Sequence, residues 1–100
     1  MGRKVIWTHH ALREQRSIFD YWNRRNEHPS YSIRLRKNIR DQVLLLRLQP
    51  FVGNFTEEFA VHRKLIAAHY LLFYRFTATE LLILSIWDTR RDPAQAPYSY

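Results

Sequence analysis

The sequence predicts an α+β domain in which a helical hairpin packs on a small, mainly antiparallel four-stranded sheet, in the order β-α-α-β-β-β. Three observations support this prediction: three consecutive strand-like runs in the last third, two basic stretches of helical periodicity before them, and one short apolar run at the start. Residues 1–100 are expected to form one domain, which is usual for a chain of this length. The tail from about residue 94 has no periodicity and is expected to be mobile.

The first strand is predicted at Val5–Trp7, directly before a helix that runs from about His9 to about Asn26. Thr8 is a candidate N-cap, because its hydroxyl can accept a hydrogen bond from an otherwise unpaired backbone N–H. One side of this helix carries the residues that are expected to face the core, namely Ala11, Gln15, Ile18, Phe19 and Trp22.

A second helix is predicted from about Ser30 to Leu48, after a break at Asn26–Ser30. Its core-facing side is expected to hold Tyr31, Leu35, Ile39 and Leu46. Three further leucines, Leu44, Leu45 and Leu48, make the C-terminal end of this helix apolar nearly all round. We therefore expect that end to be buried.

The three strand-like runs follow a predicted loop at Gln49–Asn54. They span Glu58–Ile66, His69–Phe76, and Leu81 up to the arginine pair at Arg90. Their connections are short, so antiparallel hairpins are the economical topology. Because Ile83–Trp87 is apolar on both alternating faces apart from Ser85, this run is expected to be a central strand.

The composition is that of a basic protein without cysteine. The formal net charge is +7 and the pI is about 10.3, an excess that favours nucleic acid, a ribosome, an acidic protein or an anionic membrane as partner. The absence of cysteine excludes disulfides and thiolate metal sites and fits a reducing cytoplasm. The longest apolar run, Tyr70–Tyr74, is too short to cross a bilayer, and no signal peptide is evident, so we expect a cytoplasmic protein without a membrane partner.

Candidate functional groups on the predicted sheet are cationic. Arg90 and Arg91 directly follow the last strand, where a guanidinium could bind a phosphate in bidentate fashion. His62 and Lys64 are two residues apart and therefore share a face, where histidine could transfer protons and lysine could stabilise negative charge. A solvated strand end and a polar outer sheet face are equally simple interpretations. Arg63 falls on the other face.

The predicted helices carry most of the remaining charge. Arg36, Arg40 and Arg47 return to one side of the second helix, because steps of four and seven residues do so. Such a face could follow a phosphate backbone or bind an acidic peptide, and a solvated helix face is the alternative.

We expect no metal site and no cofactor. The five histidines show no HExxH or Cys-His spacing, and no phosphate-binding glycine-rich loop or nucleophile-elbow motif is present. The only adjacent acid pair, Glu57 and Glu58, is poorer in carboxylates than a metal-dependent nuclease requires.

Taken together, these motifs resemble the RelE/ParE superfamily of bacterial type II toxins. The resemblance runs from Val5 to about Pro93 and rests on the order and spacing of several loose motifs. They are Ile6–Thr8, Ile18–Trp22, Leu48–Pro50 with Gly53, Arg63–Leu65, His69–Tyr74, and Ile83–Trp87 running to Arg90.

The resemblance implies a toxin that arrests growth and is neutralised by an acidic antitoxin, with no cofactor. It leaves two activities open: inhibition of DNA gyrase, as in the ParE-like branch, or metal-independent, ribosome-dependent cleavage of mRNA, as in the RelE-like branch. In a nuclease, Lys64, His62 and Arg90 would be the catalytic candidates by position. Tyr98 and Tyr100 would stand in loosely for a C-terminal tyrosine.

One position departs from the nuclease pattern. Leu71 stands where RelE-like nucleases, and also many ParE-like proteins, have an arginine. In a nuclease, loss of one charge-stabilising donor lowers the rate on the order of 10²–10³-fold. Leu71 and the long helical hairpin therefore favour the gyrase inhibitor, which would bind through the helical hairpin and the C-terminal segment. The binding candidates are Arg91, Arg63, the helical arginines, Tyr98 and Tyr100. A double-stranded RNA-binding module is a poorer match, because its three strands lie between its two helices.

Overall fold

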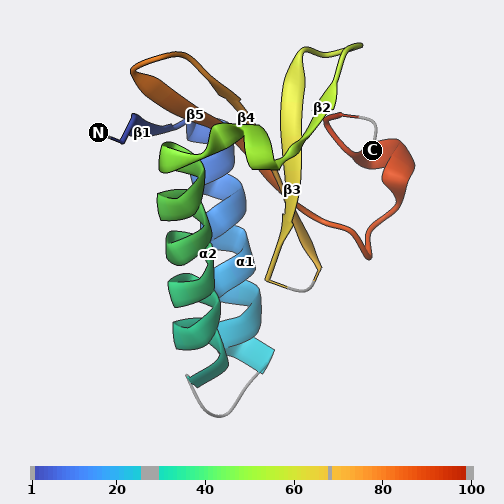
Figure 1. The fold of residues 1–100 in the computed structure, drawn as a ribbon. Helices are drawn as coiled ribbons and strands as arrows, with labels where there is room; N and C mark the ends of the chain where they lie inside the picture. Colours follow the sequence, from blue (N-terminus) through green and yellow to red (C-terminus); the bar gives the residue numbers. More distant parts are fainter. Residues whose placement is uncertain (1, 26–29, 68, 99–100) are drawn as a thin grey trace.

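A computed structural model describes residues 2–25, 30–67 and 69–98 and confirms the α+β class (Figure 1). The two helices are α1 (His9–Arg25) and α2 (Ser30–Leu48). The strands are β1 (Lys4–Trp7), β2 (Asn54–Thr56), β3 (Val61–Ile66), β4 (Tyr70–Phe76) and β5 (Glu80–Asp88). Two short 3₁₀ turns, η1 (Pro50–Val52) and η2 (Pro93–Gln95), complete the described elements.

The sheet has five strands in the order β1-β5-β4-β3-β2, where four were predicted. The additional strand is β2, which pairs antiparallel with β3 and begins at Asn54, the last residue of the predicted loop. A turn at Glu57–Ala60 separates the two strands, so β3 begins at Val61 and not at Glu58. The predicted hairpins β3–β4 and β4–β5 are confirmed, and β1 pairs parallel to β5.

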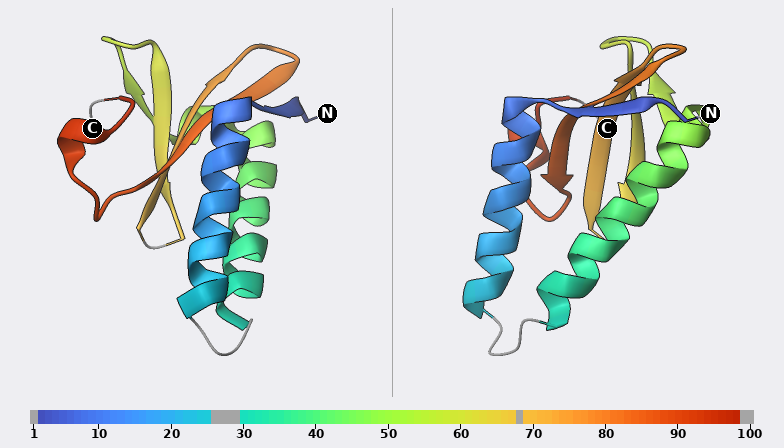
Figure 2. Two further views of the ribbon diagram at one scale, coloured as in Figure 1. Left: turned by 180° about the vertical axis from the view of Figure 1, so that it is seen from behind. Right: turned by 90° about the vertical axis from the view of Figure 1, so that its left-hand side faces the viewer.

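Both helices lie on one face of the sheet and enclose the main core (Figure 2). The predicted cap is present, since the backbone N–H of Ala11 donates to the Thr8 hydroxyl at 3.1 Å. The predicted central position of β5 is confirmed for its first half, which lies between β1 and β4, and Ser85 is completely buried. Asn26, which was predicted to end α1, and the break before α2 lie outside the described residues.

The expected burial of the C-terminal end of α2 is wrong. Leu44, Leu45 and Leu48 are 45%, 39% and 63% exposed. The core positions at this end are taken by Val43 and Leu46, which are 6% and 0% exposed. Since 3.6 residues make one turn, the remaining leucines must face outward.

The other face of the sheet has a smaller core, which the C-terminal segment covers. Val61, Leu71, Phe73 and Trp87 are buried there. The ring of Tyr98 packs 5.1 Å from that of Phe73, so the chain beyond residue 94 folds back on the sheet as far as residue 98, where a mobile tail was expected. Figure 1 shows this segment on the side of the sheet away from the helices.

Within the described residues, neither helix combines the length and the apolar character that a bilayer crossing requires.

Candidate functional site

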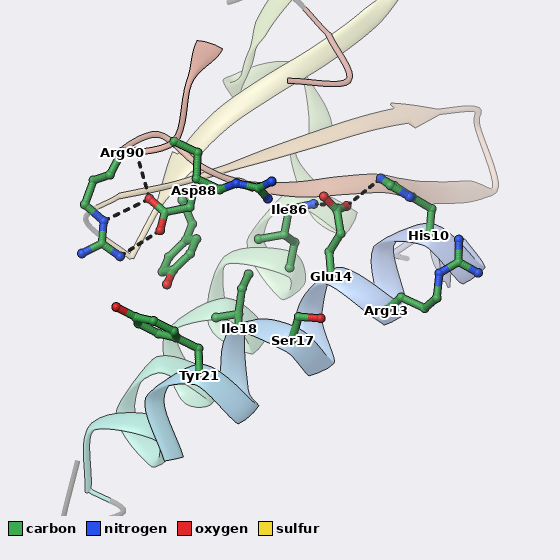
Figure 3. Close-up of a pocket in the computed structure, with 11 residues that line it drawn as sticks. His10, Arg13, Glu14, Ser17, Ile18, Tyr21, Ile86, Asp88 and Arg90 are labelled. Carbon is green, nitrogen blue, oxygen red and sulfur yellow. Dashed lines mark hydrogen bonds and ion pairs between the residues drawn. The ribbon is translucent and has the colours of Figure 1, made fainter. Parts of the chain in front are cut away.

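A hollow of the described structure lies between α1 and the C-terminal end of β5 (Figure 3). Its volume is about 720 Å³. Apolar and aromatic groups form part of its wall, and charged groups surround them. The lining residues are His10, Arg13, Glu14, Ser17, Ile18, Tyr21, Tyr70, Ile86, Asp88, Arg90 and Arg91. We refer to this hollow as the α1–β5 cavity.

Arg90 is fixed at one end of the α1–β5 cavity by Asp88. Its guanidinium donates to both carboxylate oxygens, at 3.0 Å from Nε and 2.8 Å from Nη2, and lies 5.6 Å from the ring centre of Trp22. Burial acts to raise the pKa of Asp88, but the hydrogen bonds from Arg90 outweigh it and the pKa is lowered. Because Arg90 is engaged in this way, a phosphate would have to compete with Asp88 for it.

Glu14 lies on the wall of the cavity and connects α1 to β5. Its carboxylate accepts a hydrogen bond from the backbone N–H of Ile86 at 3.2 Å and lies 3.1 Å from His10 Nε2. The Glu14 side chain is only 17% exposed, and this burial raises its pKa above the ordinary value of 4.5. A carboxylate with a raised pKa inside a basic protein is a functional-site candidate.

Glu14→Gln is expected to change how stability depends on pH. Because burial penalises the ionised form, the wild-type protein loses stability as pH rises from about 4.5 through the raised native pKa of Glu14. The variant has no carboxylate at this position, so its stability should not fall over this pH range. The difference in free energy of unfolding, variant minus wild type, should therefore increase with pH by about 1.4 kcal/mol per unit of pKa shift. Urea denaturation of both proteins between pH 4 and pH 8 measures this difference. A difference that does not change with pH would contradict a raised pKa for Glu14.

His62 and Lys64 share one face of the sheet, as their spacing predicted, and this is the face that the helices cover. Lys64 Nζ donates to the side-chain oxygen of Gln42 on α2 at 2.7 Å. The His62 ring lies among aromatic rings, 4.9 Å from both Phe55 and Phe76, and burial lowers its pKa. Both side chains are thus in contact with other parts of the domain and do not form a polar outer surface.

Arg63, Leu71 and Tyr98 belong to the opposite face. Arg63 Nη1 donates to the Thr56 hydroxyl at 2.9 Å, and Leu71 is 8% exposed in the smaller core. Tyr98 covers that core, while Tyr100 lies outside the described residues. Arg91 stacks over the ring of Trp87 at 4.4 Å and also lines the α1–β5 cavity.

Two of the three helical arginines contact neighbouring elements, and the third, Arg40, is exposed. Arg36 lies 4.3 Å over the ring of Phe19 on α1, and Arg47 donates to the backbone oxygen of Arg3 at 2.9 Å. Arg36 and Arg40 line a second hollow, of about 350 Å³, together with Val5, Trp7, Gln15, Ile39, Val43 and Leu44. We refer to this hollow as the hairpin groove.

The structure brings only part of the predicted site together. Arg90 and Arg91 meet at the α1–β5 cavity, and His62 and Lys64 share a strand. No hydrogen bond or ion pair between described residues connects these two groups. Among residues 2–25, 30–67 and 69–98, no cluster of three histidine, aspartate or glutamate side chains is arranged to hold a metal ion.

Glu14 and Tyr21 were not among the predicted site residues. A signal was present for Glu14, which lies four residues after His10 and four before Ile18, and so near the core-facing side of the helix. Nothing in the sequence indicated the contact of Glu14 with Ile86, because this contact depends on where β5 lies relative to α1.

Comparisons with known proteins identify the family. Residues 5–93 match the model of the ParE toxin of the type II toxin–antitoxin system parDE. The fold is similar to a solved structure of a chromosomal ParDE system from P. aeruginosa, with a TM-score of 0.71 and 20% identity, covering 86% of this chain and 95% of that one. No curated protein sequence matches the chain. The family match spans most of the sequence and confirms the resemblance, and the chain therefore belongs to the ParE toxin family of type II toxin–antitoxin systems.

Proposed function

We propose that this toxin acts in the cytoplasm by inhibiting DNA gyrase, and that an acidic antitoxin neutralises it. Membership of the ParE toxin family supports an inhibitor of this kind over a RelE-like nuclease. A net charge of +7 supports an acidic neutralising partner, because opposite charge steers association and stabilises the complex.

The observation that carries the proposal is the dispersal of the nuclease candidates. Lys64 is hydrogen-bonded to Gln42 under the helices, and Leu71 lies on the opposite face of the sheet. Arg90 is held by Asp88 beyond the end of β5. A general acid, a general base and a charge-stabilising donor must converge on one phosphate within hydrogen-bonding distance, and these groups do not.

The hairpin groove is the surface that we assign to the gyrase contact. It combines apolar side chains, such as Trp7 and Leu44, with the guanidinium groups of Arg36 and Arg40. Leu44 is 45% exposed, so a partner would remove apolar area from water. Aromatic and arginine side chains at a partly apolar depression are the groups that contribute most to protein binding.

Purified toxin is expected to block the supercoiling of relaxed plasmid by gyrase. Arg40→Glu should raise the concentration needed for half inhibition about tenfold, because reversing a charge inside an interface costs on the order of 1.4 kcal/mol. Lys37→Glu is the matched control, since Lys37 lies on the same helix but pairs with Asp41 outside the groove. Its inhibition should remain close to that of the wild type.

A reconstituted translation reaction tests the alternative activity. Added toxin should produce no new mRNA 5′ ends. Ribosome-dependent cuts that disappear in Lys64→Ala or Arg90→Ala would establish the RelE-like nuclease in place of the gyrase inhibitor. Supercoiling that is unaffected at concentrations that stop growth would also overturn the proposal.

A further inference from the structure

Within the described residues, no strand pairs with the second half of β5 on the side away from β4. β1 pairs with β5 only from Lys4 to Trp7, opposite Glu80–Ile83. The chain then turns into α1, so residues 84–88 form an edge of the sheet beyond the end of β1. An unpaired strand edge is a template for an additional strand.

The backbone groups of Ile86 point out of this edge. Thr89 N–H donates to the backbone oxygen of His69 at 2.8 Å, which makes Thr89 face β4. Because neighbouring residues of a strand direct their backbone groups to opposite sides, Ile86 and Asp88 face away from β4. Ile86 N–H confirms this direction, since its partner is a side chain of α1 and not a strand.

Two side chains occupy the positions that a neighbouring strand would take. The Glu14 carboxylate accepts the Ile86 N–H at 3.2 Å, and the Thr8 hydroxyl donates to the Leu84 carbonyl at 3.3 Å. An inward-pointing charge is one of the ways in which proteins protect a sheet edge from other chains. Glu14 thus imitates the carbonyl oxygen of a missing strand.

The space beside this edge is large and basic at its rim. Figure 3 shows α1 and β5 diverging from Glu14 toward Tyr21 and Arg90, which opens the α1–β5 cavity. Neither Arg13 nor Arg91 forms an ion pair with any described carboxylate. A further hollow of about 330 Å³ shares Ser17 and Tyr21 with the cavity and is also lined by Asp20 and by two more arginines of α1, Arg24 and Arg25.

We propose that an extended acidic segment of the antitoxin adds to the sheet as a strand along residues 84–88 of β5. A backbone carbonyl of this segment takes the Ile86 N–H from Glu14. Alternate apolar side chains enter the cavity toward Ile18 and Tyr21, and the acidic side chains contact Arg13 and Arg91. This inference rests on the proposed function, because it places the acidic partner named there.

The exchange leaves no buried charge without a partner. Glu14 keeps His10, whose Nε2 lies 3.1 Å from its carboxylate, when it gives up Ile86. Backbone hydrogen bonds supply affinity in strand addition, and the side chains that alternate along the segment supply specificity. The basic rim then selects an acidic segment over a neutral one.

The exchange rate of the Ile86 amide in Glu14→Ala, measured by NMR with and without antitoxin, tests whether a strand is added. The probe is the protein encoded by the short acidic reading frame expected beside the toxin gene. In the free variant the Ile86 amide should exchange about tenfold or more faster than in the wild type, because its acceptor is gone. Binding of the antitoxin should slow exchange of the Ile86 amide again by a similar factor. The exchange rate of a core amide, such as that of Leu72, serves as the internal reference.

Glu14→Gln and Glu57→Ala are the matched variants. The side-chain amide oxygen introduced by Glu14→Gln can still accept the Ile86 N–H. The Ile86 amide of this variant should therefore stay protected in the absence of antitoxin, and such protection would show that the site is folded. Glu57, exposed at the β2–β3 turn, should leave the Ile86 amide unchanged. A complex in which the Ile86 amide of Glu14→Ala still exchanges at its free rate would overturn the inference while leaving the proposed function intact.

Charge reversal tests the second contact. Arg13→Glu or Arg91→Glu should weaken antitoxin binding at least about tenfold in a calorimetric titration. Arg16→Glu, on the same helix and exposed but outside the cavity, should have a much smaller effect. Equal losses for Arg13→Glu and Arg16→Glu would contradict the proposed contact. Failure of the wild-type toxin to bind the acidic protein at all would instead refute the antitoxin partner of the proposed function.

Discussion

Trp22→Ala is expected to lower the free energy of unfolding by about 3 kcal/mol, a large share of the stability of a domain this small. The indole N–H donates to the Tyr70 hydroxyl at 2.7 Å, joining α1 to β4. The ring lies 4.5 Å from that of Tyr31 on α2 and 5.6 Å from the Arg90 guanidinium. One side chain therefore connects both helices, the sheet and the α1–β5 cavity. Urea denaturation followed by circular dichroism measures the change.

Trp22→Phe separates the two contributions of this residue. Phenylalanine retains most of the ring packing and loses the hydrogen bond, which should cost about 1 kcal/mol. An alanine variant that is destabilised no more than the phenylalanine variant would show that packing at this position contributes little.

Leu71→Arg is expected to destabilise the toxin without creating a nuclease. The side chain is 8% exposed in the smaller core, so a guanidinium placed there would lose water without gaining an acid partner, at a cost of about 2–3 kcal/mol. Lys64 and His62 remain on the other face of the sheet, so the new arginine would not complete a site with them. Denaturation and mapping of mRNA 5′ ends measure the two effects.

Leu65→Arg is the control for this substitution. Leu65 is the cross-strand neighbour of Leu71 but is 53% exposed, so the same change should alter stability by no more than about 0.5 kcal/mol. Ribosome-dependent cleavage gained by Leu71→Arg would mean that the cation reaches a functional site, and would contradict the gyrase assignment.

Local signals in the sequence were sufficient for most of the elements. The Thr8 cap and the helical stripe defined the start of α1, and the apolar run at Ile83–Trp87 identified the central strand. These features depend on residues close together in the chain. The resemblance, which rests on several such motifs in order, indicated the correct family.

The features that sequence reasoning missed depend on long-range placement. Neither helix nor strand packs over Leu44, Leu45 and Leu48 at the end of α2 within the described residues, so these three leucines are exposed although Leu46 is buried as predicted. The three-residue strand β2 exists because β3 is available to pair with it. Glu14 becomes part of a site only where the helix approaches the free edge of β5.

The parallel pairing of β1 with β5 also determines when this toxin can become complete during synthesis. The first strand of the chain has its place beside the last strand, and the apolar sides of both helices pack on strands that are made after them. Contacts between distant parts of a chain form late, and translation delivers the N-terminal part first. The β1–β5 pair therefore cannot form until β5 has left the ribosome, so β1 and both helices wait for partners that are made after them.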